Sequence, residues 1–265
     1  MQPTSAKAIL VVSFGTSYAS ARAAAIESIE SKLAAAFPEH RIYRAWTSKM
    51  IIRKLKRQEQ LIIPTVTEAI EQIIRDGIRE LIVQPTHVIN GIENDIMKED
   101  VLAFKDHFAS IAFGTPLLTS QADCSAVINA LANEFQPDEK TALVLMGHGT
   151  DHHANAVYAA LDYACKDTGH TNIFIGTVEA YPAIDSVLRQ LKAFQPQKVL
   201  LAPLMIVAGD HARNDMAGDE PDSWKNLLQK EGYEVQPVLK GLGEYPIIRD
   251  LFCSHAAEAV KASAV

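Results

Sequence analysis

The sequence predicts an α/β fold built on parallel sheets. Short runs of aliphatic and β-branched residues alternate along the chain with longer segments of helical periodicity. We expect strands at 8–13, 41–45, 80–84, 111–113, 141–146, 172–176, 198–202 and 234–237. Helices are expected near 18–36, 48–60, 65–76, 92–108, 121–135, 152–167, 181–194, 222–231 and 245–262. A strand–helix alternation of this kind gives parallel sheets with helices on both faces.

An internal repeat divides this pattern in two. ILVVSFGTSY at 9–18 parallels LVLMGHGTDH at 143–152, since each is an apolar strand that ends in a Gly-Thr turn before a helix. LIVQPTHVINGIENDIM at 81–97 parallels VLLAPLMIVAGDHARNDM at 199–216. The duplication predicts two Rossmann-like lobes, each a four-stranded parallel sheet of order 2-1-3-4 flanked by helices. An approximate two-fold should relate the lobes, with equivalent loops facing each other over a cleft.

The lobes are expected to span 1–120 and 121–265, with the crossing between them at 116–120. The last helix, at 245–262, packs either on its own lobe or back on the first.

Composition excludes several classes of protein. The chain of 265 residues is 48% hydrophobic and 22% charged, which is typical of a globular protein. A net charge of −7 and a pI near 5.7 argue against a general nucleic-acid surface. No apolar stretch has the length of a membrane span or of a signal-peptide core, so a cytoplasmic protein is expected, although a processed form would look the same. Three scattered cysteines without a CxxC indicate free thiols.

Three polar residues follow neighbouring strands of the predicted second lobe. His148 comes directly after one strand, Glu179 follows the next along the chain, and His211 lies in the loop after the third. Because the carboxyl ends of parallel strands lie along one sheet edge, these side chains should converge there. Two imidazoles and a carboxylate suit a divalent metal ion and proton transfer beside it.

Each of these residues also has an ordinary structural interpretation. His148 could be a hydrogen-bonded turn residue, although Gly147 and Gly149 on either side permit close approach of a bulky ligand. The carboxylates near His211 could orient its ring or could cap the following helix. Glu179 could be a helix-start carboxylate.

The segment HGTDHH suggests a different use of the same histidines. His148 and His152 have the i, i+4 spacing of helical zinc ligands. The flanking glycines disfavour a continuous helix, and the glutamate of an HExxH motif is absent. A zinc hydrolase is therefore the weaker interpretation.

A basic cluster stands out in this acidic chain, and it comprises Lys49, Arg53, Lys54, Lys56 and Arg57. It is either a solvated helix face or a receptor for a polyanionic ligand, with Arg53 and Lys54 as the contacts. Backbone N–H groups of two turns could serve the same ligand, and they belong to Ser13, Phe14, Gly15, Thr16, Asn90 and Gly91. Neither a GxxxxGK[ST] nor a GxGxxG motif follows a strand, so nucleotide use has no support.

Six segments in series resemble one family. They are VVSFGTSY, RAWTSKMIIRKL, MGHGTDHHA, VEAYP, PLMIVAGDHARNDMAGDEPDSW and GLGEYPIIRDLF, and they span nearly the whole chain. The chain is similar to the anaerobic sirohydrochlorin cobaltochelatases, the CbiK type of the class II tetrapyrrole chelatases.

The resemblance implies a chelatase-like fold and the ATP-independent insertion of Co²⁺ into sirohydrochlorin for cobalamin synthesis. Insertion of Fe²⁺ toward siroheme, use of Ni²⁺, and a non-catalytic tetrapyrrole or metal carrier remain as alternatives. It also implies that His148 and His211 bind the metal and that Glu179 is the active-site glutamate, so these three are the expected catalytic residues.

Metal and tetrapyrrole are then substrates, no further cofactor is expected, and a homo-oligomer is compatible with the family. We expect the macrocycle to contact Phe14, Trp46 or Met205, with His87, at the repeat position of Met205, lining the cleft.

Overall fold

The computed structural model describes residues 7–263 and divides into two compact units. Unit 1 contains the described residues up to Thr119 together with those from Tyr245 onward, and unit 2 is Ser120–Glu244. The chain passes from unit 1 to unit 2 between Thr119 and Ser120, and the C-terminal helix belongs to unit 1.

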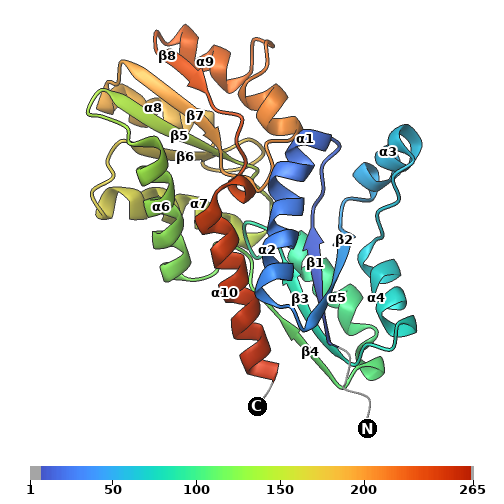
Figure 1. Cartoon of the computed structure of the whole chain (residues 1–265). Coiled ribbons are helices and arrows are strands. Elements are labelled where there is room, and N and C mark those ends of the chain that lie inside the picture. The colour runs from blue at the N-terminus through green and yellow to red at the C-terminus, as the bar shows by residue number, and fades with distance from the viewer. Residues whose placement is uncertain (1–6, 264–265) are drawn as a thin grey trace. The chain divides into compact units, whose positions relative to one another are not determined.

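Unit 1 is built on a four-stranded parallel sheet with the order β2-β1-β3-β4 (Figure 1). Its strands are β1 (Lys7–Ser13), β2 (His40–Trp46), β3 (Glu80–Pro85) and β4 (Ser110–Phe113). In register, Ile9 of β1 stands opposite Ile42 of β2 and Ile82 of β3. The predicted strands and the 2-1-3-4 order are confirmed.

The helices of unit 1 follow the predicted segments, with two local differences. They are α1 (Ala19–Ala21), the π-helix η1 (Arg22–Glu27), α2 (Ser28–Ala36), α3 (Lys49–Glu59), α4 (Val66–Arg75), α5 (Ile92–Leu102), the 3-10 turn η2 (Lys105–His107) and α10 (Pro246–Ser263). The first predicted helix thus contains a π-helical segment. The helix expected over 92–108 ends at Leu102, and the turn that follows packs Phe104 and Phe108 against the core.

Alternation along β1 explains how two helical layers cover this sheet. Ala8, Leu10 and Val12 are fully buried in a cluster with residues of α4 and α5. On the other face α10 lies beside α2 and contacts β3 and β4 (Figure 1). Phe252 of α10 is fully buried. The fully apolar strand therefore predicts, correctly, a sheet covered on both sides.

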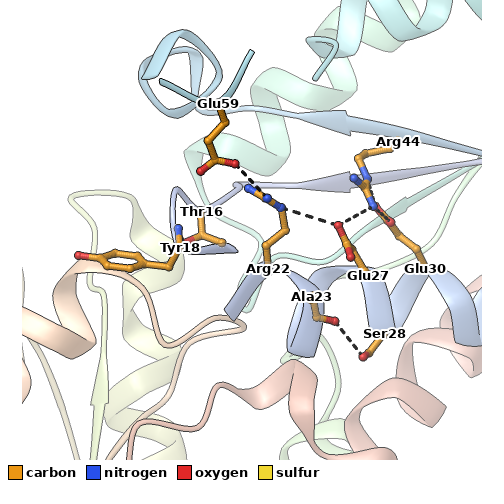
Figure 2. Close-up of polar contacts among 9 residues, drawn as sticks. All are labelled: Thr16, Tyr18, Arg22, Ala23, Glu27, Ser28, Glu30, Arg44 and Glu59. Carbon is orange, nitrogen blue, oxygen red and sulfur yellow. Dashed lines mark hydrogen bonds and ion pairs between the residues drawn. The ribbon is translucent and has the colours of Figure 1, made fainter. Parts of the chain in front are cut away.

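Ion pairs join the first helical layer to strand β2, as Figure 2 shows. Arg44 of β2 binds Glu30 of α2, with Arg44 Nε donating to Glu30 Oε1 at 2.7 Å. Burial raises the pKa of Glu30, and the Arg44 guanidinium opposes this shift. Arg22 Nη2 lies 3.2 Å from Glu59 at the end of α3, and Arg22 Nε lies 3.8 Å from Glu27.

Unit 2 repeats the sheet of unit 1, with the order β6-β5-β7-β8 (Figure 1). Its strands are β5 (Thr141–Gly147), β6 (Ile173–Thr177), β7 (Lys198–Pro203) and β8 (Glu234–Pro237). Leu143 of β5 stands opposite both Ile173 of β6 and Leu200 of β7. These strands also confirm the prediction.

The helices of unit 2 include short segments that periodicity does not reveal. They are α6 (Gln121–Phe135), the 3-10 turn η3 (His153–Asn155), α7 (Ala156–Asp167), α8 (Ile184–Phe194), the π-helix η4 (Ala212–Met216), α9 (Trp224–Lys230) and the 3-10 turn η5 (Leu242–Glu244). The helix expected over 181–194 starts only at Ile184, after Pro182. The polar stretch after β7, predicted as a loop, contains η4.

No helix within residues 7–263 is long and apolar enough to cross a membrane.

Candidate metal centre

Three side chains of unit 2 meet where the strands of its sheet end. His148 follows β5, Glu179 stands two residues after β6, and His211 begins the π-helix η4 after β7. Each offers a ligand atom, and these atoms lie within 4.8 Å of one another. The order β6-β5-β7 is what places the three strand ends side by side.

Glu179 lies within reach of both imidazoles. Its Oε2 is 3.6 Å from His148 Nδ1, and its Oε1 is 3.9 Å from His211 Nε2. The two rings stand edge to face with centroids 4.6 Å apart. The side chains keep 42%, 52% and 32% of their surface exposed for His148, Glu179 and His211, so a ligand can reach all three.

Hydrogen bonds fix how each imidazole is presented. His148 Nδ1 lies 2.8 Å from the carbonyl oxygen of Gly149, and His211 Nδ1 lies 2.8 Å from Asp215 Oδ2. A carbonyl and a carboxylate oxygen only accept, so Nδ1 carries the proton in both rings. With Nδ1 as the donor, the Nε2 lone pair of each ring is the one that can bind a metal ion. Asp215, on η4, is the orienting carboxylate that the sequence suggested near His211.

Glycine makes the turn after β5 possible. Gly149 has a φ of +88°, and a Cβ there would lie 2.8 Å from the backbone nitrogen of Ala180. The tight approach lets the Glu179 N–H donate to the His148 carbonyl oxygen at 2.9 Å. The loops that carry His148 and Glu179 are thus joined by their own backbones.

Asn155 joins the same two loops a second time, and no sequence pattern indicated this role. Its Oδ1 accepts from the Thr150 N–H at 3.1 Å, and its Nδ2 donates to the Tyr181 carbonyl oxygen at 2.5 Å. Because its partners are backbone groups of two different loops, only the folded arrangement reveals this bridge.

His152 caps a helical turn and does not have the role of zinc ligand considered above. Its Nδ1 accepts a hydrogen bond of 3.2 Å from the Ala154 N–H, which caps the turn η3. The neutral ring then carries its proton on Nε2 and has no lone pair left for a metal. The segment from His148 to His152 contains no helix, so the i, i+4 spacing does not bring these rings onto one helical face.

Several residues expected to bind the macrocycle turn inward in unit 1. The Ser13 hydroxyl accepts from Thr86 Oγ1 at 2.8 Å and is 2% exposed, and Thr16 Oγ1 accepts from the Tyr18 N–H (Figure 2). Trp46 is fully buried beneath Gly15, where a Cβ would lie 2.4 Å from its ring. In this structure the Trp46 ring supports the loop at Gly15, so its expected contact with the macrocycle stays a prediction.

Three other predicted contacts are exposed, whereas Asn90 is half-buried and Gly91 is buried. Phe14 is 44% exposed, and Arg53 and Lys54 lie on the exposed face of α3. Asn90 Nδ2 donates to Thr119 Oγ1, and Gly91 is the N-cap of α5.

Position 87 and its repeat counterpart differ in their surroundings. Both ring nitrogens of His87 are buried without a hydrogen-bond partner among the described residues. Met205 of unit 2 is partly buried against the core.

Comparison with known proteins gives consistent matches over almost the whole chain. The family described as cobalt chelatase (CbiK) matches residues 7–261. A sirohydrochlorin cobaltochelatase of Salmonella typhimurium (strain LT2) is 40% identical over 255 residues, covering 96% of each chain. Sirohydrochlorin cobaltochelatase CbiKC of Nitratidesulfovibrio vulgaris (strain Hildenborough) is 31% identical over 266 residues, covering 98% of this chain and 93% of that protein.

Solved structures share the fold at much lower identity. SirB from Bacillus subtilis, solved with Fe³⁺, has a TM-score of 0.65 at 16% identity, covering 98% of each chain. CbiX, described as the terminal enzyme for siroheme biosynthesis in denitrifying bacteria, has a TM-score of 0.56 at 17% identity. That match covers 97% of this chain and 99% of CbiX.

Proposed function

Because the chain belongs to the cobalt chelatase (CbiK) family, we propose that it inserts Co²⁺ into sirohydrochlorin, as its curated relatives are named for doing. The reaction exchanges one divalent cation for the two pyrrole N–H protons of the macrocycle, and it serves cobalamin synthesis. No nucleotide-binding motif follows a strand of the chain, in keeping with an ATP-independent reaction.

The observation that supports this proposal best is the convergence of His148, Glu179 and His211 within 4.8 Å. An inserting enzyme must bind a metal ion and then release it. Two neutral imidazoles and one carboxylate hold a borderline divalent ion without the permanence of a thiolate cage. The exposure of all three side chains leaves room for a second substrate to approach the ion.

The residues then divide the work by their chemistry. His148 and His211 donate Nε2 lone pairs to the incoming ion, held in this tautomer by Gly149 and Asp215. Glu179, placed between the rings, balances the charge of the ion and accepts a pyrrole proton as the metal–nitrogen bonds form. The second proton leaves to solvent.

For the carboxylates of the macrocycle we assign Arg53 and Lys54 of unit 1. Both lie on the exposed face of α3 in a chain that carries a net charge of −7. A local basic cluster is the feature through which such a chain can hold a polyanionic substrate. The metal chemistry thus falls to unit 2 and the contacts with the substrate carboxylates to unit 1.

A side-by-side insertion assay tests the proposal. Purified protein is mixed with sirohydrochlorin and Co²⁺, Fe²⁺ or Ni²⁺, and the change in the macrocycle absorption is followed. The His₂Glu set suits all three ions, so Fe²⁺ insertion toward siroheme is the alternative that this assay separates.

We expect many turnovers per protein molecule with Co²⁺. Binding of the metallated macrocycle without turnover would identify a carrier and contradict the proposal. A higher rate with Fe²⁺ than with Co²⁺ would assign the chain to the siroheme branch.

A further inference from the structure

Tyr158 lies directly beneath the turn that presents His148. It belongs to α7 and is only 2% exposed. Its ring packs against the α-carbon of Gly147, the last residue of β5, where an added Cβ would lie 2.4 Å from ring carbon Cε1. Only glycine at this position lets an aromatic ring approach the backbone so closely.

The hydroxyl end of Tyr158 reaches the next two residues of the turn. Burial raises the pKa of this phenol to about 12, and hydrogen bonding from the backbone amides of Gly149 and His148 opposes the shift. The phenol is therefore neutral at physiological pH, and the backbone amides of His148 and Gly149 stabilise its ionised form. The same side chain thus packs its ring against Gly147 and has its hydroxyl beside the next two residues of the turn.

The Gly149 residue links Tyr158 to the imidazole. Its backbone amide lowers the pKa of the Tyr158 phenol and so lies near the hydroxyl, and its carbonyl oxygen binds His148 Nδ1 at 2.8 Å. That carbonyl is the group that keeps the proton of His148 on Nδ1. A shift of this turn would therefore change where the Nε2 lone pair of His148 points.

We propose that Tyr158 is a positioning residue of the metal centre, which fixes the turn from Gly147 to Gly149 and thereby holds the His148 imidazole in its metal-binding orientation. The inference rests on the proposed role of His148 as a ligand of the substrate metal. It assigns to a buried tyrosine a specific effect on the binding of Co²⁺.

Tyr158→Phe tests this inference because it removes the hydroxyl and keeps the ring. Co²⁺ alone is titrated into the protein, and binding is followed by the visible absorption of the bound ion and by calorimetry. We expect about tenfold weaker Co²⁺ binding, the size of effect usual for groups that orient metal-binding histidines. In the insertion assay, KM for Co²⁺ should rise while KM for sirohydrochlorin stays unchanged.

Tyr163→Phe is the matched control. It lies on the same helix with 72% of its surface exposed, and it should bind Co²⁺ like the unmodified chain. If Tyr158→Phe lowers only the unfolding temperature and leaves Co²⁺ affinity unchanged at 25 °C, the tyrosine is a core residue and the inference is wrong.

Gly147→Ala disturbs the same contact from the other side, because its methyl group would collide with the Tyr158 ring. It should weaken Co²⁺ binding as well, and in combination with Tyr158→Phe the two effects should be less than additive. Fully additive losses of Co²⁺ affinity would mean that Gly147 and Tyr158 act independently, which would contradict the inference.

Failure of the proposed function would look different. In that case the unmodified chain would bind Co²⁺, yet no metal would enter sirohydrochlorin.

Discussion

The two units close their sheets with the same backbone hydrogen bonds and then place different side chains on them. In unit 1 the Ser48 N–H donates to the Phe14 carbonyl oxygen at 3.2 Å, and in unit 2 the Glu179 N–H donates to that of His148 at 2.9 Å. Phe14 is thus the counterpart of His148, and Ser48 that of Glu179. The duplicated backbone supplies equivalent positions, and in unit 2 these positions carry a histidine and a glutamate that could hold a metal ion.

The turns that follow the first strand of each unit repeat this relation. Gly15 and Gly149 both have positive φ angles, of 103° and 88°. Beneath Gly15 lies the indole of Trp46, whereas Gly149 lies against the backbone of Ala180. The same glycine conformation therefore allows packing on a hydrophobic ring in one unit and a close contact between the loops of His148 and Glu179 in the other.

The units diverge most in the chain that follows their second and third strands. After β2 the basic helix α3 is inserted, with Ser48 as its N-cap, whereas the corresponding stretch after β6 leads from Glu179 to α8 without another helix. After β3 the regular helix α5 follows, whereas after β7 the π-helix η4 places Asp215 against His211. π-helical segments often occur where function constrains geometry.

The largest difference in Co²⁺ binding is expected between variants of the first pair of counterparts, His148 and Phe14. His148→Ala removes a ligand of the substrate metal, so we expect Co²⁺ binding and insertion to fall by more than about 100-fold. Phe14→Ala, at the equivalent turn of unit 1, should leave the binding of Co²⁺ to the protein unchanged. Calorimetric titration with Co²⁺, followed by the insertion assay, measures both variants.

The same titration can contradict the assignment of the metal centre to unit 2 alone. If Phe14→Ala weakens Co²⁺ binding as much as His148→Ala, the metal centre is shared by both turns and the division of labour between the units fails.

A smaller effect on insertion is expected at the second pair of counterparts, Glu179 and Ser48. Glu179→Gln keeps the shape of the side chain and removes its charge, so the rate of insertion should fall by about 100-fold through loss of the proton acceptor. Ser48→Ala removes the cap of α3, where the hydroxyl accepts from the Ile51 N–H, and should lower the unfolding free energy by about 1 kcal/mol.

Unfolding in denaturant and steady-state kinetics distinguish the two outcomes. A stability loss without a rate loss in Glu179→Gln would make this glutamate a structural residue like its counterpart.

Sequence patterns were sufficient for the fold and for the convergence of the site. Buried parallel strands are apolar along their whole length, and their carboxyl ends lie on one edge, so runs such as ELIVQ and the polar residues after them could be placed in order. Repetition of the Gly-Thr turn at Gly15 and Gly149 then predicted two lobes of the same fold.

The supporting contacts could not be predicted in this way. Asn155 bonds to backbone groups of two loops, and Tyr158 is one apolar position among many on α7. Trp46 was expected against the macrocycle, yet the structure buries its ring under Gly15 at the end of β2. Periodicity gives the face of a strand or helix, but the partner of a side chain at a strand end depends on how the next loop folds.

The smallest effect at neutral pH should come from the third pair of counterparts, His87 and Met205. Each accepts a backbone hydrogen bond at the same point, from Leu117 in unit 1 and from Leu242 in unit 2. Burial lowers the pKa of His87 from its usual 6.5 to about 4. The folded protein therefore keeps this ring neutral, while the unfolded chain takes up a proton below pH 6.5.

The sign of the pH effect follows directly. As the pH falls from 6.5 toward 4, protonation stabilises the unfolded chain, so His87 destabilises the fold by about 1.4 kcal/mol per pH unit and by about 3 kcal/mol in all. His87→Met, which installs the residue of unit 2, should flatten this part of the profile and leave Co²⁺ affinity at neutral pH unchanged. Unfolding free energies of both proteins between pH 4 and 7 test the prediction, because titration of the other groups cancels in the difference. Parallel profiles would mean that the imidazole is protonated in the folded chain and that its environment is polar.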